Sequence, residues 1–390
     1  MPINGQPPGA NGGDPEGYEP IQTLHVENYG CIRKATFTLS PLHALIGPND
    51  SGKSTTLRAL RTVAQGAASQ FVWARETETW QPFDPMLDPA SSVTIRFRDG
   101  VGYRLSSADP DDQDRSRAGR MLETVLVGSE EYPSHGAPRR GFNEPGLLAT
   151  SIDEKEPDAF REASMALRGR ITTATMIRFD SNALRAPSRQ ILANEPIQFF
   201  DETGHGLPSV YQALNTRHVD VFVAIRNRLR DFFPTIRDLL LPTVASNDVV
   251  IKARLAGGNE VDAGALSDGV LYFMGFAGLR YLRPSRLFLV EEPENGLHPA
   301  RIAEVMNILR EISKQSQVII ATHSPLVVNE LEGHEVSVVT RDPEDGTRSI
   351  LLKDVPGFDD AAKVYKPGEF WVSYADGKLE EPLLSGMPRP

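Results

Sequence analysis

A glycine-rich segment has residue types suited to binding a polyphosphate. Gly47, four further residues and Gly52 are followed directly by Lys53 and Ser54, which is the spacing of a Walker A phosphate loop. Glycines let backbone amides point inward at an anion, because they have no side chain and tolerate positive φ. Lys53 would supply positive charge to the β- and γ-phosphates, and the Ser54 hydroxyl is a ligand for Mg²⁺. The predicted nucleotide contacts are Gly47, Pro48, Asn49, Asp50, Ser51, Gly52, Lys53, Ser54 and Thr55.

A second chemical segment is an apolar run that ends in carboxylates. The residues 287–290 are all apolar, and Glu291 and Glu292 follow them directly. A buried strand that terminates in paired acids beside a phosphate loop is the Walker B pattern. In this interpretation Glu291 holds Mg²⁺ through its water shell, and Glu292 orients or deprotonates the attacking water. The alternative is a charged strand end followed by an ordinary turn.

Two weaker signals complete the set of candidate site residues. Ser267 and Gly269 come just before an apolar helix at 271–281, where the serine suits an N-cap and the glycine allows close approach of backbone. His323 follows a buried strand at 317–321 and could donate a hydrogen bond to a γ-phosphate. A lone Ser-Asp-Gly is commonly a plain cap, and a lone histidine is more often structural. Beside a phosphate loop, the functional interpretation of His323 is favoured, with Lys53 and Glu292 as the other catalytic candidates.

The elements that must position these residues follow from periodicity and turn residues. Alternating segments predict three antiparallel hairpins, and helical spacing predicts a helix that begins at Lys53 and ends at Gly66 and a long helical stretch at 207–241. The hairpins are expected at 21–28 with 32–40, at 92–98 with 101–105, and at 331–340 with 347–353. The expected organisation is a disordered tail (1–19), an N-terminal lobe (20–105), an insertion or lid (106–200), a C-terminal lobe (201–355) and a C-terminal tail (356–390).

Composition narrows the function classes. The 390 residues are 24% charged and 40% hydrophobic, which is ordinary for a globular protein, and no apolar run approaches the length of a membrane span. The single cysteine, Cys31, excludes an internal disulfide framework. The N-terminal residues lack the regions of a signal peptide, so we expect a cytoplasmic protein. A formal net charge of -11 means that nucleic acid could bind only through a local basic patch.

Such a patch could come from arginines of the insertion, although acidic residues are interleaved with them and a solvated surface is the better interpretation. The arginines concerned are Arg115, Arg117, Arg120, Arg139, Arg140, Arg168 and Arg170.

The order of these motifs resembles the ABC-type ATPases of the RecF, SMC and OLD-nuclease group, in particular their stand-alone prokaryotic AAA-like members. The resemblance covers roughly 20–100 and 200–355. It implies an α/β P-loop NTPase fold of ABC-head type, with a mixed central sheet, an N-terminal antiparallel β subdomain and a largely helical insertion. It further implies that two copies sandwich two ATP molecules head to tail. Ser267 and Gly269 would then touch the γ-phosphate held by Lys53 of the other copy, with 295–298 as the D-loop at the dimer seam.

The sequence departs from that family's pattern at several positions. Glu291 stands where most ABC proteins have Asp, which puts the Mg²⁺ geometry and the turnover rate in question. Asp268 replaces a glycine of the signature, so its carboxylate must point away from the phosphate or pair with a cation. The Q-loop glutamine is not assigned, and Gln70, Gln81 and Gln190 are the candidates. No Toprim domain is expected after residue 321, and therefore no nuclease activity within this chain.

Two functions follow from the resemblance. The first is an Mg²⁺-dependent ATP hydrolase that forms a homodimer around ATP and couples this to DNA-related work, such as repair or anti-phage defence. The alternative is a slow ATP-dependent switch that binds and regulates a partner effector protein. A P-loop kinase is disfavoured, because the loop at Ser267 and the strand end at His323 would have no purpose in it. No membrane partner is expected.

Overall fold

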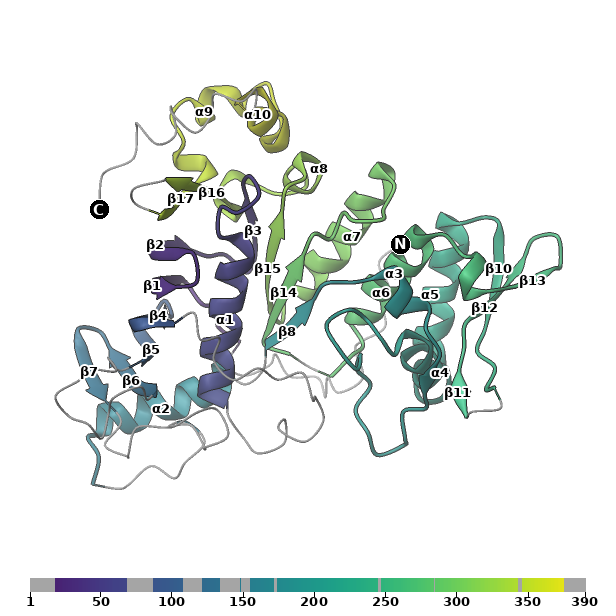
Figure 1. Ribbon diagram of the computed structural model, residues 1–390, viewed down its shortest axis with the longest axis horizontal. Coiled ribbons are helices and arrows are strands. Elements are labelled where there is room, and N and C mark those ends of the chain that lie inside the picture. The colour runs from purple at the N-terminus through teal and green to yellow at the C-terminus, as the bar shows by residue number, and fades with distance from the viewer. Residues whose placement is uncertain are drawn as a thin grey trace. The chain divides into compact units, whose positions relative to one another are not determined.

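The computed structural model describes residues 18–68, 87–107, 121–133, 148, 155–171, 174–244, 247–283, 285–342 and 346–374. The chain forms two compact units. The phosphate-loop unit comprises residues 17–175, 285–289 and 313–390, and the signature unit comprises 1–16, 176–284 and 290–312. Figure 1 shows the elements of both, coloured along the chain. Among the described residues, no helix is both long enough and apolar enough to cross a membrane.

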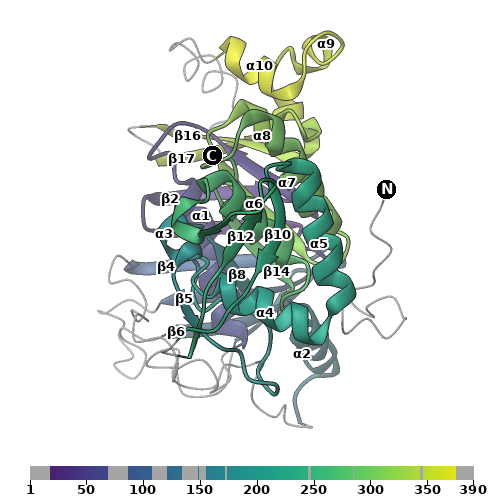
Figure 2. The ribbon, with the colours of Figure 1, turned by 90° about the vertical axis from the view of Figure 1, so that its right-hand side faces the viewer.

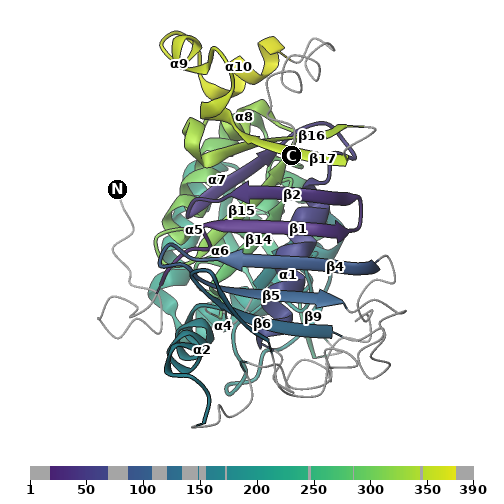
Figure 3. The same ribbon diagram turned by 90° about the vertical axis from the view of Figure 1, so that its left-hand side faces the viewer.

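The phosphate-loop unit contains an antiparallel sheet. Its strands are β1 (Thr23–Tyr29), β2 (Ile32–Thr38), β4 (Leu87–Arg96), β5 (Val101–Ser107), β6 (Met121–Val127) and β7 (Glu130–Pro133). Their order is β2-β1-β4-β5-β6-β7, and Figure 3 shows β2, β1, β4, β5 and β6 side by side. The pairings β1–β2 and β4–β5 confirm the first two predicted hairpins. The third is confirmed by β16 (Val336–Asp342) and β17 (Gly346–Leu351), which pair antiparallel.

The region expected to be a largely helical insertion also contains strands. Its described residues extend the antiparallel sheet with β6 and β7 before the helix α2 (Asp158–Arg170). The apolar and β-branched residues of β6 are largely buried, which explains why this segment adds a strand. The last two residues of the region expected to be a disordered N-terminal tail also make contacts. Tyr18 donates to the carbonyl of Ser313 at 3.3 Å, and Glu19 pairs with Arg170 at 2.7 Å.

The second sheet of this unit has the order β17-β16-β3-β15-β14-β8. It contains β3 (Leu42–Ile46), β15 (Gln317–Thr322), β14 (Leu287–Glu291) and β8 (Ala174–Ile177), and the last two strands continue into the signature unit. Strand β3 runs parallel to both β15 and β16, so the sheet is mixed, as predicted. The strand residues of β3 and β15 are buried throughout, which is typical of parallel strands covered on both faces.

Helix α1 (Lys53–Ala68) connects the two sheets of the phosphate-loop unit. It contacts β15 of the mixed sheet and β1, β4 and β5 of the antiparallel sheet (Figure 1). Leu57, Leu60 and Val63 are fully buried on its apolar face, as the spacing predicted. The prediction that this helix ends at Gly66 is wrong, because the helix continues to Ala68. Buried Gly66 is followed by alanines, and alanine is the best helix former.

The C-terminal part of the phosphate-loop unit is formed by short helices. They are α8 (Pro325–Val328), α9 (Phe358–Ala361) and α10 (Pro367–Tyr374). Phe370 is buried and packs edge-on against Phe358 with ring centroids 5.4 Å apart, so an aromatic side chain docks this segment.

The signature unit is built on four longer helices, several of which face the viewer in Figure 2. They are α4 (Leu207–Arg217), α5 (Val219–Phe232), α6 (Asp268–Leu279) and α7 (Pro299–Ile312). Short elements accompany them: α3 (Ser181–Arg185), a sheet of β10 (Ile236–Leu240), β12 (Lys252–Leu255) and β13 (Glu260–Asp262), and a pair of β9 (Ser188–Arg189) and β11 (Asp248–Val249). Most residues of helix α6 are buried, and Leu271, Phe273 and Met274 are fully buried.

The predicted helical stretch at 207–241 is wrong in two respects. The chain forms two helices that are separated at His218, whose backbone is not helical (φ -142°, ψ 61°), and it then enters strand β10. Pro234 ends the second helix, because proline disfavours helical backbone at the residue before it. The apolar spacing is nevertheless helical on both sides of the break, which is why the periodicity did not reveal it.

Candidate functional site

The phosphate loop lies between β3 and α1 in the phosphate-loop unit, as predicted. A Cβ atom at Gly47 would lie 1.9 Å from the carbonyl oxygen of Val339, and a Cβ at Gly52 would lie 2.6 Å from Oγ1 of Thr347. The loop backbone is left-handed at Asp50 (φ 62°) and at Gly52 (φ 104°). Both glycines are therefore required by close packing, and Gly52 also by its backbone conformation.

Side chains outside the motif hold this loop in place. Thr347 Oγ1 donates to the carbonyl of Ser51 at 3.0 Å, and Thr56 Oγ1 donates to the carbonyl of Gly52 at 2.9 Å. Val339 and Thr347 belong to β16 and β17, far along the chain from the loop that they support. The sequence did not point to these two residues, because nothing in their local pattern differs from an ordinary strand.

Lys53 is positioned inside the loop. Its Nζ atom donates to the carbonyl of Gly47 at 2.8 Å and to that of Pro48 at 2.7 Å. Four residues of this segment are exposed: Pro48, Asn49, Asp50 and Ser54. The 16-residue helix α1 begins at Lys53, so its N-terminal amides lie at the end of the loop. A turn with left-handed residues, a helix N-terminus and a lysine amine together suit a phosphate anion.

His323 lies at the same edge of the mixed sheet as the phosphate loop. In the parallel pairing of β15 with β3, Thr322 stands opposite Ile46. The next residues along the two strands are His323 and Gly47. Thr322 Oγ1 accepts a hydrogen bond from the amide of Ser324 at 2.9 Å, and the Ser324 side chain accepts from the amide of Leu326. This turn leaves the His323 side chain exposed just beyond the strand end.

The two predicted acids lie in the signature unit and differ in environment. Glu291 is buried, with 8% exposure, and its Oε2 atom lies 3.4 Å from Nε of Arg178, while its buried Oε1 atom has no hydrogen-bond partner among the described residues. A buried carboxylate oxygen without a donor fits a cation ligand. Glu292 has a left-handed backbone (φ 46°) and accepts from Nδ2 of Asn295 at 2.6 Å. Such strained backbone concentrates at functional positions.

The Ser267–Gly269 loop forms the N-terminus of α6. Ser267 occupies the N-cap position, but its side chain makes no capping hydrogen bond. Asp268 Oδ1 lies 2.6 Å from Nη2 of Arg185, so the expectation that Asp268 either points away or pairs with a cation is met by pairing. A Cβ at Gly269 would lie 3.1 Å from the carbonyl oxygen of Gly296. The predicted signature and D-loop segments are thus close neighbours within one unit.

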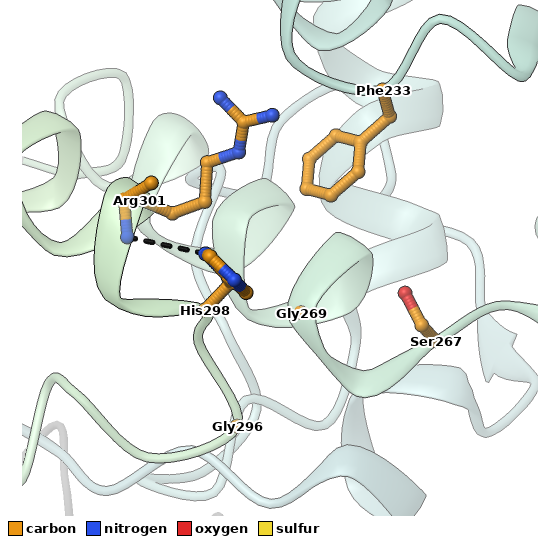
Figure 4. A pocket seen from close by; sticks show the side chains of 7 residues that line it. Phe233, Ser267, Gly269, Gly296, His298 and Arg301 are labelled. Atoms are coloured by element: carbon orange, nitrogen blue, oxygen red, sulfur yellow. Dashed lines mark hydrogen bonds between the residues drawn. The ribbon is translucent and has the colours of Figure 1, made fainter.

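A pocket of about 520 Å³ opens beside this loop in the signature unit. Figure 4 shows the pocket with the side chains of Phe233, Ser267, His298 and Arg301. Arg301 donates to the carbonyl of Phe232 at 2.5 Å, and its guanidinium lies 4.8 Å and 5.5 Å from the ring centroids of Phe232 and Phe233. The complete lining is Phe233, Ser267, Gly269, Gly296, His298, Ala300 and Arg301.

The pocket includes predicted and unpredicted residues. Ser267, Gly269, Gly296 and His298 come from the predicted signature and D-loop segments. Phe233 and Arg301 were not predicted, because an aromatic at a helix end and an arginine in a first turn occur throughout such proteins.

Other candidates either contact residues outside these motifs or lie outside the described residues. Gln190 donates from Nε2 to Thr243 Oγ1 at 3.1 Å, whereas Gln70 and Gln81 lie outside the described residues. Of the clustered arginines, Arg170 pairs with Glu19 and with Asp99 at 2.8 Å and covers the ring of Phe97. Its guanidinium is therefore engaged in the fold. Except for Arg168 and Arg170, the other five arginines of that set lie outside the described residues.

Comparison with known proteins gives the family. A family model described as "AAA domain, putative AbiEii toxin, Type IV TA system" matches residues 42–329, and no curated protein matches. Among solved structures, the SMC head domain from Thermotoga maritima is 14% identical with a TM-score of 0.45, and the match covers 85% of this chain and 98% of that chain. An SMC head bound to the C-winged helix domain of ScpA is 17% identical with a TM-score of 0.49, and the match covers 85% and 97%.

A third structure is the SMC head domain with an extended coiled coil bound to the C-terminal domain of ScpA, from Pyrococcus furiosus. It is 14% identical with a TM-score of 0.44, and the match covers 88% of this chain and 99% of that chain. The family match runs continuously from β3 through α8 and includes every predicted site residue. The chain therefore belongs to the family of AAA domains described as "AAA domain, putative AbiEii toxin, Type IV TA system".

Proposed function

We propose that this chain is an Mg²⁺-dependent ATP hydrolase. The observation that supports this most directly is the register of β3 and β15, in which Thr322 stands opposite Ile46. That register brings the first residue of the phosphate loop and His323 to the same sheet edge, where α/β folds bind ligands. The family match supports the same conclusion, because it names an AAA domain.

Each predicted residue has a defined task in this reaction. The loop amides from Gly47 to Thr55 and the amine of Lys53 bind the phosphates, and His323 donates a hydrogen bond to the γ-phosphate. Ser54 and Glu291 hold Mg²⁺, which when bound neutralises charge on the phosphate oxygens. Glu292 accepts a proton from the attacking water or orients it. The unpartnered Oε1 of Glu291 and the exposed Ser54 hydroxyl are consistent with these ligand roles.

The active form that we propose is a homodimer in which two copies meet head to tail. Ser267 and Gly269 of one copy then approach the γ-phosphate bound at Lys53 of the other. Support comes from the exposed Ser267 side chain, which does not cap its own helix, and from the pocket that this loop shares with His298 and Arg301. An open polar loop at a helix N-terminus can accept an anion from outside the unit.

Two kinds of biological work follow, and they make different demands on turnover. One is coupling of hydrolysis to DNA-related work such as repair or anti-phage defence, which rests on the resemblance to the RecF and SMC group. The other is a slow ATP-dependent switch that restrains or releases a partner effector protein. The family description favours the switch, because it names a toxin of a toxin–antitoxin system.

The ATPase rate as a function of protein concentration tests the dimer. Turnover per copy should rise with concentration before it levels off, because a monomer lacks half of each site. A turnover per copy that stays constant from the lowest concentration would reject the sandwich.

Glu292→Gln separates the two kinds of work. This variant should bind ATP without hydrolysing it, so a switch keeps its biological effect while a machine driven by hydrolysis loses it. Adding duplex DNA to the same assay tests the DNA-related role, and a rate unchanged by DNA of any form would count against it.

A further inference from the structure

A carboxylate in the loop that is proposed to meet a phosphate raises an electrostatic problem. Asp268 stands between Ser267 and Gly269, and its side chain is 53% exposed. Like charges repel, and an aspartate beside an incoming γ-phosphate would weaken its binding. Arg185 is the cation that faces this carboxylate, with Nη2 at 2.6 Å from Oδ1.

The segment that carries Arg185 is firmly attached to α6. Asp180 caps α3 by accepting hydrogen bonds from the amides of Asn182 and Ala183. The ring of Phe179 packs edge-on against Phe276 with centroids 5.0 Å apart, and the Tyr272 hydroxyl donates to the Phe179 carbonyl at 3.0 Å. These contacts place Arg185 beside the first turn of α6 independently of its ion pair.

One glycine in α6 makes this attachment possible. A Cβ at Gly275 would lie 2.7 Å from the Phe179 ring, so only glycine admits the ring at this distance from the helix. The guanidinium at the end of α3 is also constrained: the Arg185 side chain is 26% exposed and its Nε atom is buried. The backbone and the Nε atom of Arg185 are therefore held in place, while the terminal nitrogen Nη2 reaches the Asp268 carboxylate.

The ion pair has little value for stability. Asp268 is more than half exposed, and exposed ion pairs contribute little to the free energy of unfolding because water screens them. Its larger effect is on the charge that the loop presents. With Arg185 paired, the Ser267 hydroxyl and the α6 amides face outward without a net negative charge beside them.

We propose that Arg185 is a positioning residue for the trans site: it neutralises Asp268 and turns that carboxylate away, so that Ser267 and Gly269 can accept the γ-phosphate of a second copy. This inference rests on the proposed head-to-tail dimer and deepens it. It assigns a role to a residue outside all four predicted motifs. It also explains how the loop tolerates an acid at a position that faces an anion.

The test measures ATP-dependent dimerisation in the Glu292→Gln background by sedimentation velocity with Mg²⁺ and ATP. Arg185→Gln should raise the dissociation constant of the dimer about tenfold, the size expected for one uncompensated like charge near the interface. Arg185→Gln combined with Asp268→Asn should return the constant to within about threefold of the parent, because the repelling charge is gone. Arg185→Lys, which keeps the charge, should behave like the parent.

A matched control is Arg254→Gln on β12, which removes an exposed arginine paired with Glu260 at 2.9 Å and should leave dimerisation unchanged. Asp268→Asn alone should dimerise at least as tightly as the parent, and this variant does not depend on the stability of Arg185→Gln. Unchanged dimerisation of Arg185→Gln, or no recovery in the folded double variant, would overturn the role of Arg185. A parent that stays monomeric with ATP would instead refute the proposed dimer, and the inference with it.

Discussion

The Nε atom of Arg178 lies 3.4 Å from Oε2 of Glu291, so an arginine faces the buried acid that is predicted to hold Mg²⁺. The Arg178 side chain is 66% exposed, whereas that of Glu291 is 7% exposed. The pair is therefore unequal: the arginine can leave into water at little cost, and the carboxylate cannot. The backbone amide of Arg178 is held by the carbonyl of Glu202 at 2.8 Å, so only its side chain is free to move.

A double-mutant cycle measures this relationship. Arg178→Gln should lower the free energy of unfolding by about 1 kcal/mol, the upper end for an exposed ion pair, because the arginine is mostly solvated while the carboxylate is buried. In a Glu291→Gln background the same change should have almost no effect. Urea denaturation in the presence of a chelator gives all four values. Strictly additive effects would show that the two side chains do not interact.

Replacement of Lys53 should remove nucleotide binding without unfolding the protein. Its amine bridges two loop carbonyls, and in the proposed complex it makes charge-assisted hydrogen bonds to the phosphates. Lys53→Ala should weaken ATP binding about 10- to 100-fold, the range for one or two such bonds, and should abolish turnover. Isothermal titration calorimetry measures the affinity.

The matched control for that variant is Lys34→Ala on β2, where the amine pairs with Glu27 at 2.9 Å on the surface. It should bind ATP as the unmodified protein does. If both lysine variants lost affinity equally, general charge rather than the phosphate loop would explain the binding.

Gly47→Ala should be strongly destabilising. The added Cβ would lie 1.9 Å from the Val339 carbonyl oxygen, which is backbone of the neighbouring strand β16 and cannot move aside as a side chain can. We expect a loss of about 3 kcal/mol, the upper part of the usual range for overpacking. Gly257→Ala, whose Cβ would meet nothing within 4 Å, should change the free energy of unfolding little. Equal losses in both variants would show that the close approach at Gly47 is absent in solution.

His43 should make stability depend on pH. Burial lowers the pKa of His43 to about 3, and its ring nitrogens lie 3.1 Å and 2.9 Å from the hydroxyls of Ser40 and Ser337. The unfolded state binds a proton near pH 6.5 that the folded state does not, so this contribution to stability is complete above that pH and is lost as the pH falls toward 3. The expected loss is about 2 kcal/mol between pH 7 and pH 5.

Urea denaturation across that pH range checks the prediction, with His43→Gln as the comparison. Glutamine does not titrate. Between pH 7 and pH 5 the free energy of unfolding of this variant should therefore fall by about 2 kcal/mol less than that of the unmodified protein. Parallel pH profiles for the two proteins would show that His43 is not the group responsible.

The sequence by itself determined most of the local structure around the phosphate loop and the three hairpins. The strand, loop and helix from Leu42 to Ala68 depend on residues that are adjacent in the chain, and so do the turns at Gly30 and Gly100. Such features follow from backbone preferences and from the period of apolar residues, which a single sequence displays. The break at His218 was missed because apolar helical spacing continues on both sides of it.

Only the tertiary structure decided which side chains support the site. Thr347 holds Ser51, Arg185 pairs with Asp268, and Arg178 faces Glu291, each across a long separation in the sequence. An arginine or threonine at such a position has no local signature, because its partner is chosen by how strands and helices pack. The sequence required that the Asp268 carboxylate either point away from the phosphate or pair with a cation. The packing of α3 on α6, through Phe179 and Gly275, determined that Arg185 supplies the positive charge.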